Sequence, residues 1–217
     1  MIELLNIDCM EYMATQPDNA FDLAIVDPPY GIKYNNVLHP DRPTKKWKNP
    51  NSQVYKNFND GKQPNKKYFS DLFRVSKNQI IWGANNFYGV PANGGWIVWD
   101  KKVDPKERLS MAELAYSSFN KKIMIFRYLW AGFKKEKQVK RIHPTQKPVA
   151  LYNWLLKNYA EPGQRILDTH LGSGSSAIAA HYFGCDFVGC EIDKEYYDEM
   201  VKRFKRETSQ IAMFEGI

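Results

Sequence analysis

Asp27, Pro28, Pro29 and Tyr30 form a short, rigid, polar segment directly after the apolar run 21–26. Because proline has no backbone N–H, the carbonyls around Pro28 can accept from a ligand without local competition. Asp27 adds a charged acceptor, and Tyr30 adds a flat ring with a polar tip. Two acceptors beside an aromatic face suit a base that carries an NH2 group. We predict that these four residues are catalytic; a strand ended by an incidental Pro-Pro turn is the alternative.

The chemistry expected at this segment is direct displacement by an aryl amine. Such an amine is a poor nucleophile because its lone pair is delocalised into the ring. Hydrogen bonds at tetrahedral angles would turn that pair toward an electrophile, and an activated methyl group held in line needs no further activation. In a duplex the base must first be flipped out of the stack.

A glycine-rich turn lies late in the chain, where residues 166–177 run from a predicted strand into a predicted helix. Gly172, Gly174 and Ala177 fit the pattern G-x-G-x-x-A, in which glycine lets a ligand approach the backbone at a helix N-terminus. Glu191 follows at the distance expected for a carboxylate that binds ribose hydroxyls. The pattern predicts an adenosine-type cofactor; a tight turn without a ligand is the alternative.

Asp168 precedes these glycines and bears on which cofactor is bound. A dinucleotide needs its pyrophosphate held at the glycine turn. Adenosine with an amino-acid tail needs instead a partner for the ammonium group of that tail, and Asp168 is placed to be one. This favours S-adenosylmethionine over NAD.

Apolar runs and turn signals predict strands and helices in alternation along most of the chain. The predicted strands are residues 1–7, 21–26, 79–82, 96–99, 114–117, 123–126, 165–167 and 187–190. The predicted helices are residues 9–15, 66–75, 149–159 and 175–183, with a last helix capped by Asp193. We expect strands 114–117 and 123–126 to form a pair. The alternation predicts a doubly wound α/β sheet.

The composition is that of a globular protein: 217 residues, 43% hydrophobic and 25% charged. We expect one domain over residues 1–217. No apolar run has the roughly 18 residues that a membrane helix needs, and the N-terminus lacks signal-peptide features, so we expect no membrane partner and a cytoplasmic location. Cys9, Cys185 and Cys190 form no metal-type pair, which indicates a reducing compartment and no metal.

The net charge of +7 is unevenly distributed. Residues 31–67 hold nine Lys/Arg and two acids, and residues 120–147 hold nine Lys/Arg and one acid. The rest of the chain is acidic, with thirteen basic and twenty-one acidic residues. Two basic segments on an acidic body indicate a polyanionic partner. Solvated surface loops are the alternative.

Taken together, these motifs resemble the β-class amino-methyltransferases of DNA, which modify adenine N6 or cytosine N4. In that family the catalytic segment precedes the cofactor-binding glycine segment, and the same order occurs here. The resemblance spans nearly the whole chain. It rests on residues 8–9, 27–30, 82–87, 143–148, 168–176 and 187–193.

The resemblance implies a permuted Rossmann-like sheet of the class I methyltransferase fold, mostly parallel, whose first two strands come from the C-terminal end. It implies S-adenosylmethionine over the glycines, with Glu191 on the ribose, Asp8 near the adenine and the segment around Lys147 over the methionine part. The chain departs from the family at Thr169-His170, where Pro-Phe is usual, which puts that contact in doubt. The predicted cofactor-binding residues are Asp8, Cys9, Thr145, Gln146, Lys147, Asp168, His170, Leu171, Gly172, Ser173, Gly174, Ser175 and Glu191.

The function expected from the resemblance is methylation of adenine N6 in double-stranded DNA, in a restriction-modification context. Asp27 favours adenine because relatives that modify cytosine N4 often have Ser at that position. Cytosine-N4 methylation and a catalytically silent DNA-binding subunit are the alternatives; RNA and protein amides are weaker ones. A homodimer is compatible with these expectations. We interpret His143 as a hydrogen-bonded loop residue and not as a base.

The inserted segments 31–67 and 101–142 are predicted to recognise the target. In them cations alternate with aromatic residues, which suits phosphate binding and base stacking. Ordinary core packing is the alternative for the aromatic residues, and we expect it for about half of them. The aromatic residues in and near these segments include Tyr34, Tyr55, Phe58, Phe126, Tyr128, Trp130 and Phe133. The predicted nucleic-acid contacts are Lys33, Arg42, Lys45, Lys46, Trp47, Lys48, Lys134, Lys135 and Arg141.

Overall fold

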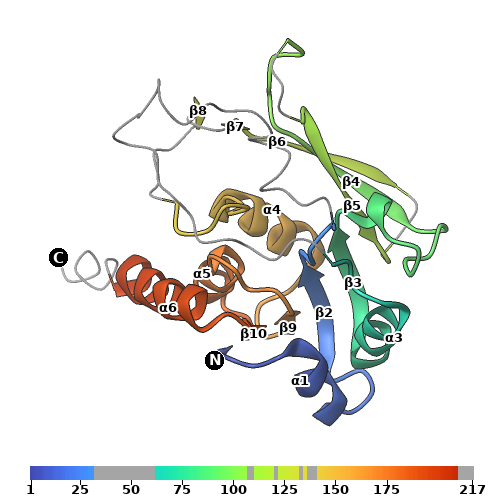
Figure 1. The fold of residues 1–217 in the computed structure, drawn as a ribbon, viewed down its shortest axis with the longest axis vertical. Coiled ribbons are helices and arrows are strands. Elements are labelled where there is room, and N and C mark those ends of the chain that lie inside the picture. Colours follow the sequence, from blue (N-terminus) through green and yellow to red (C-terminus); the bar gives the residue numbers. More distant parts are fainter. Residues whose placement is uncertain (32–61, 107–109, 120–121, 132–133, 136–140, 210–217) are drawn as a thin grey trace.

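In the computed structural model, helices cover both faces of one large sheet (Figure 1). The structure describes residues 1–31, 62–106, 110–119, 122–131, 134–135 and 141–209. Within these ranges, no helix is both long enough and apolar enough to span a bilayer.

The sheet has eight strands in the order β1-β10-β9-β2-β3-β5-β4-β6. Strands β9 and β10, from the C-terminal part of the chain, lie between β1 and β2, from the N-terminal part, as the predicted permutation requires. A separate two-stranded sheet joins β7 (Trp130–Ala131) to β8 (Lys134–Lys135). The strands of the large sheet are β1 (Ile2–Leu5), β2 (Phe21–Val26), β3 (Ser76–Trp82), β4 (Gly95–Asp100), β5 (Ala112–Ser117), β6 (Ile123–Arg127), β9 (Arg165–Asp168) and β10 (Asp186–Cys190).

Most strand pairs are parallel, and β5 is the exception because it runs antiparallel to both β3 and β4. The predicted pairing of strands 114–117 and 123–126 is therefore wrong. Strand β4 lies between them and pairs in parallel with β6. Strand β5 thus begins where the parallel strand β3 ends.

The helices occupy the positions that their sequences predict. They are α1 (Cys9–Thr15), α3 (Lys66–Val75), α4 (Val149–Tyr159), α5 (Ser175–Phe183) and α6 (Lys194–Ser209), with a short 3-10 turn, η1 (Ala84–Asn86). Asp8 caps α1 by accepting from the Met10 N–H at 2.8 Å. Asp193 caps α6 by accepting from the N–H of Glu195 at 2.9 Å, as predicted.

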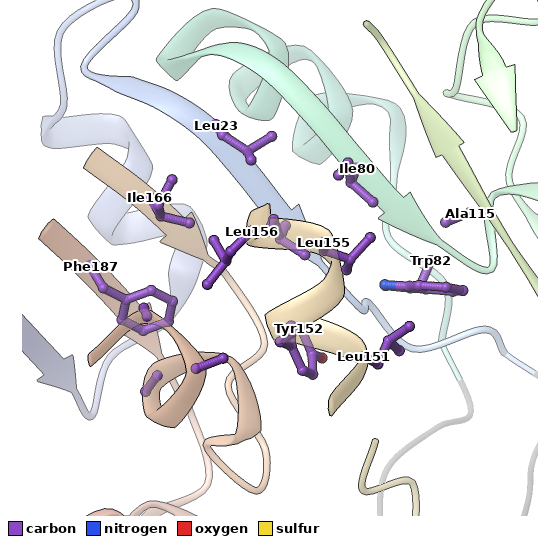
Figure 2. Close-up of a cluster of buried hydrophobic side chains, with 14 of the residues drawn as sticks. Leu23, Ile80, Trp82, Ala115, Leu151, Tyr152, Leu155, Leu156, Ile166 and Phe187 are labelled. Carbon is purple, nitrogen blue, oxygen red and sulfur yellow. The ribbon is translucent and has the colours of Figure 1, made fainter. Parts of the chain in front are cut away.

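Alternate residues of β2 serve two hydrophobic cores, one on each face of the sheet. Leu23 and Ile25 belong to the core under α4 and α5, and Ala24 and Val26 to the core under α1 and α3. Figure 2 shows Leu155 of α4 among the strand side chains of the first core. Burial on both faces explains why the sequence of β2 is a continuous apolar run. It also fixes where Asp27 leaves the sheet.

Candidate active site

Asp27 and Tyr30 lie at the carboxyl end of β2 and are hydrogen-bonded to each other. The Tyr30 hydroxyl donates to Asp27 Oδ1 at 2.7 Å, and the side chain of Asp27 is largely buried. Burial and the carboxylates of Asp27 and Glu113 raise the pKa of Tyr30 well above its usual value, so its hydroxyl stays protonated. An acceptor and a neutral aromatic ring therefore stand side by side, as the sequence predicts.

The ring of Tyr30 packs against the turn that follows β3. Gly83 has φ +67°, and a Cβ added there would lie 2.1 Å from Tyr30 Cε1. Phe87 meets the ring edge-on, with centroids 6.1 Å apart. Glycine at position 83 thus satisfies both the left-handed backbone and the close approach of the ring. The family resemblance included this stretch without giving it a role.

Lys147 connects the Asp27 segment to the glycine segment. Its ammonium is ion-paired with Asp27 Oδ2, and its main-chain carbonyl accepts from the Ser175 hydroxyl at 2.7 Å. The residue is only 5% exposed. Residues 27–30 and the first residue of α5 are therefore brought together through a single lysine.

The glycine turn between β9 and α5 is tied to the end of β10. The Gly172 N–H donates to Glu191 Oε2 at 2.8 Å, and Glu191 Oε1 accepts from the Asp193 N–H at 2.9 Å. Gly174 has φ +75°, and a Cβ there would lie 2.6 Å from Met200 Cγ. Leu171, Ser173 and Ser175 are buried within this turn. A carboxylate has about four lone-pair positions, so Glu191 can still accept from a ligand.

Asp168 is a buried carboxyl group at the end of β9, only 2% exposed. It accepts from the Ser176 hydroxyl at 2.6 Å and from the His170 N–H at 3.0 Å. Among the described residues it forms no ion pair with a lysine or arginine. Burial raises its pKa to about 7, although both hydrogen bonds act in the opposite direction. The site therefore contains a buried carboxyl group that has no cationic partner among the described residues.

His170 lies beside this carboxyl group in place of the phenylalanine usual in the family. Its Nδ1 is 2.9 Å from the Thr169 hydroxyl, and its ring meets Tyr68 with centroids 5.5 Å apart. Burial lowers its pKa to about 4, so the ring is neutral at neutral pH. The nearby charge of Asp8 opposes this shift. His170 thus supplies a neutral ring at this position, and its contact with a ligand remains a prediction.

The loop before α4 is held by its own side chains. His143 is buried, its Nδ1 is 3.1 Å from the Thr145 hydroxyl, and burial lowers its pKa to about 4, which confirms the interpretation of a loop histidine. Gln146 Oε1 accepts from the Ile142 N–H at 2.9 Å, and its carbonyl accepts from the Trp130 indole at 2.9 Å. These contacts orient Lys147.

Glu113 is a site residue that the sequence analysis missed. It lies on β5, and Lys147 reaches Glu113 Oε2 at 3.1 Å. Lys101, the residue directly after β4, forms an ion pair with Glu113 Oε1. Burial opposes the charge of Glu113, but Lys147 and Lys101 more than offset it and lower its pKa to about 2. A single carboxylate in an otherwise uncharged strand was the available signal.

Most of the predicted DNA contacts lie outside the described residues. The aromatic residues Phe126 and Trp130 are buried in the core and so are not available to stack on bases, which agrees for these two with the alternative of core packing. Arg141 lies over the Trp130 ring, 5.4 Å from its centroid. Lys134 and Lys135 form β8. Lys33, Arg42, Lys45, Lys46, Trp47 and Lys48, with the aromatic residues Tyr34, Tyr55, Phe58 and Phe133, fall outside the described residues.

Comparison with known proteins gives consistent matches. A family model described as DNA methylase (N6_N4_Mtase) matches residues 40–202, well over half of the chain. The type II methyltransferase M2.MboI of Moraxella bovis is 24% identical over 93% of this chain and 86% of its own. The solved M1.HpyAVI–SAM complex has a TM-score of 0.59 at 20% identity, covering 94% of this chain and 100% of the other.

A second solved structure, the cytosine-N4-specific PvuII DNA methyltransferase, has a TM-score of 0.60 at 13% identity, covering 96% of this chain and 90% of the other. At such identities the two structures establish the fold: a permuted, mostly parallel methyltransferase sheet. Within the described parts of the chain, no group of three or more His, Cys, Asp or Glu residues is arranged to hold a metal ion.

Proposed function

Because the chain belongs to the N6/N4 DNA methylase family, we propose that it transfers a methyl group from S-adenosylmethionine to the exocyclic amino group of a flipped base in double-stranded DNA, adenine N6 by preference. The observation that carries this proposal is the position of Lys147, whose ammonium binds Asp27 while its carbonyl accepts from Ser175. The acceptor for the base and the turn for the cofactor therefore share one edge of the sheet, where ligands of open α/β sheets bind.

The residues at the glycine turn fit a cofactor with an amino-acid tail. Asp168 is a buried carboxyl group without a cationic partner among the described residues, and an ammonium group would supply one. Glu191 keeps free lone pairs for ribose hydroxyls, and Asp8 is near enough to His170 to affect its pKa. When bound, S-adenosylmethionine supplies an electrophilic methyl group on a sulfonium.

The catalytic segment would hold and orient the base. Asp27 and the carbonyl of Pro28 would each accept one hydrogen of the amino group, and Tyr30 would stack on the ring. Pro29 would keep the segment rigid. Asp27 or water would take the extra proton of the amine after methylation. In this proposal the protein accelerates the reaction mainly by positioning the amino nucleophile.

Binding of S-adenosylmethionine is expected to release a proton through Asp168. The pKa of Asp168 is raised to about 7 in the free protein, and an ammonium partner would favour the ionised form. The affinity for S-adenosylmethionine should therefore rise about tenfold per pH unit below pH 7 and level off above pH 7. Calorimetry in buffers of different ionisation enthalpy measures the proton release.

An Asp168→Asn variant tests the assignment of this proton. The asparagine side chain keeps an acceptor for the Ser176 hydroxyl but cannot ionise. Both the affinity for S-adenosylmethionine and the dependence of that affinity on pH should therefore fall. The raised pKa also means that the folded state binds more protons than the unfolded chain between about pH 4 and 7. Stability of the free protein therefore falls as pH rises through that window, and the variant should lose this fall. Unchanged affinity in the variant would contradict the role.

The choice between adenine and cytosine rests on Asp27 alone, since cytosine-N4 relatives often carry Ser at that position. One structural neighbour is specific for cytosine N4, so cytosine-N4 methylation remains the alternative. The deciding experiment is incubation of plasmid DNA with labelled S-adenosylmethionine, followed by nucleoside mass spectrometry. Detection of methyladenine would support the proposal, and detection of methylcytosine would support the cytosine-N4 alternative. If neither base is methylated, the proposed methyltransferase activity is contradicted.

DNA binding is expected to depend steeply on salt because the two basic segments would neutralise phosphates. Affinity should fall by about 10³-fold or more between 50 and 200 mM salt. The triple variant Lys45→Gln, Lys46→Gln, Lys48→Gln should lower the slope of log affinity against log salt by about 2 to 3. Fluorescence anisotropy with labelled duplexes measures both.

The matched control for this experiment removes two lysines from the surface of α6, Lys194 and Lys202, whose partners Asp198 and Glu199 lie on the same helix. This variant should keep the slope of the original protein. An equal change in both variants would show a general effect of net charge, and a flat salt dependence would contradict the assignment of these segments.

A further inference from the structure

Four charged side chains of alternating sign lie in a row along the edge of the sheet, from the end of β4 to the end of β2. Lys101 pairs with Glu113, Glu113 with Lys147, and Lys147 with Asp27. The four side chains are largely buried, and Lys147 most of all. The two lysines and two carboxylates balance in charge. Four such groups at one edge, one of them in the catalytic segment, call for a role beyond folding.

The surroundings of these four charged side chains include buried tryptophan rings. Trp82 and Trp99 are fully buried and meet edge-on, with centroids 6.3 Å apart. The Lys147 ammonium lies 5.7 Å from the Trp82 ring, and Lys101 lies 5.2 Å from the Trp99 ring. Glu113 stands opposite Trp99 in the register of β4 and β5. Weak screening there makes each charge strongly sensitive to its neighbours.

Lys147 divides its ammonium between two carboxylates. An ammonium has three donors, and Lys147 donates to Asp27 Oδ2 and to the Tyr30 hydroxyl at 3.3 Å. Glu113 Oε2, at 3.1 Å, is an ion-pair contact that accepts no hydrogen bond from the described residues. Asp27 already accepts from Tyr30 through Oδ1. An amino group that approaches Asp27 must therefore share this carboxylate with Lys147. How firmly Lys147 holds Asp27 depends on how much of it Glu113 retains.

We propose that Glu113 is a positioning residue that draws the Lys147 ammonium partly away from Asp27, so that Asp27 can accept the amino group of the target base. This inference rests on the proposed function, because it presumes that Asp27 accepts such a group. Glu113 itself touches neither base nor cofactor. It acts through Lys147, and Lys101 holds it in place from the other side.

The test is the variant Glu113→Gln, which keeps size and shape and removes the charge. Lys147 would then turn fully to Asp27 and compete with the base. We expect kcat for duplex DNA to fall about tenfold to a hundredfold, which is less than the roughly 10²- to 10³-fold lost when a direct charge-stabilising contact is removed, because Glu113 acts through Lys147. KM for DNA and the affinity for S-adenosylmethionine should stay within about threefold. Equal losses in all three, or no loss of kcat, would overturn the proposal.

Two further variants separate positioning from folding. Glu113→Asp keeps the charge and should recover most of the lost rate. In a Lys147→Gln background, Glu113→Gln should cause no further loss of kcat, because the residue that it acts through is gone. Losses that multiply would show that the two act independently and would refute the proposal. The kcat values are compared at a temperature at which circular dichroism shows that every variant is folded.

The control is Glu199→Gln, which makes the same change in a surface ion pair with Lys202, whose charged atoms lie 2.8 Å apart. It should leave kcat unchanged. If the original protein methylates no DNA, the proposed function fails. If it methylates DNA and Glu113→Gln is equally active, only the role of Glu113 fails. The two failures are therefore distinguishable.

Discussion

Replacing Asp27 with alanine is expected to lower methyl transfer to DNA by about 10³-fold while binding of DNA and S-adenosylmethionine persists. Asp27 is the charged acceptor at the end of β2, and its loss would remove one of the two contacts proposed to orient the amino group. The fold should survive, because Lys147 keeps Glu113 as a partner. Single-turnover methylation and anisotropy binding to the same duplex measure the two effects separately.

The variant Asp27→Asn refines this result. It keeps an acceptor oxygen but not the charge, so its rate should lie between those of the alanine variant and the original protein. Asp18→Ala is the matched control: its partner is Arg74, on α3, and its side chain is well exposed, so normal activity is expected. Full activity of Asp27→Ala would remove Asp27 from the mechanism. If the original protein binds DNA but transfers no methyl group, the alternative of a silent subunit is supported.

The parts of the fold that follow from local pattern were predicted closely. Strand β2 has the predicted bounds Phe21–Val26, because a run buried on both faces ends where the prolines begin. Helices α3 and α5 also have their predicted bounds. The permuted, mostly parallel sheet was confirmed as well, although it was inferred from the family resemblance. Strand order is set by contacts between distant parts of the chain, which periodicity does not encode.

The error in strand pairing shows this limit. Strands β5 and β6 are separated by a short connection, which favours a hairpin, yet β4 lies between them. Contacts between elements far apart in the sequence accompany this order, such as the packing of Trp82 of β3 against Trp99 of β4 in the core. A single sequence gives the composition of each strand but not its neighbours.

The candidate site was predicted in its motifs but not in its electrostatics. The sequence indicated Asp27, the glycine turn and Asp168, because each follows a recognisable strand. It assigned Lys147 to the cofactor, which stays a prediction, and it did not indicate that the Lys147 ammonium pairs with Asp27 and Glu113. Glu113 reaches the site only because β5 runs antiparallel to β3. That direction brings the first residues of β5 to the edge where β3 ends.

Replacing Lys147 with methionine is expected to destabilise the protein by about 3 to 5 kcal/mol, because removing one partner of a buried ion pair leaves its counterpart uncompensated. Here two carboxylates, Asp27 and Glu113, lose their shared cation. For a chain of this size the melting temperature should fall by roughly 6 to 20 °C. Denaturant unfolding and a thermal melt measure the loss.

The dependence of this loss on pH identifies its source. In the folded protein the pKa of Glu113 lies near 2, against an ordinary value of 4.5, because Lys147 and Lys101 outweigh the effect of burial. A lowered pKa stabilises the fold above pH 4.5, and this contribution disappears as pH falls toward 2. The difference in stability between the original protein and Lys147→Met should therefore narrow as the pH falls from about 4.5 to about 2.

The matched control for Lys147→Met is Lys67→Met. Lys67 pairs with Asp71 at 2.7 Å on the surface of α3, and its side chain is 69% exposed. Solvent screens such a pair, so the substitution should cost less than about 1 kcal/mol at any pH in this range. A similarly small loss for Lys147→Met would mean that Asp27 and Glu113 are well solvated in the folded protein. The positioning role of Glu113 would then lose its electrostatic basis. If solvent screens the Lys147 ammonium, Glu113 cannot weaken its hold on Asp27 enough to affect the binding of the base.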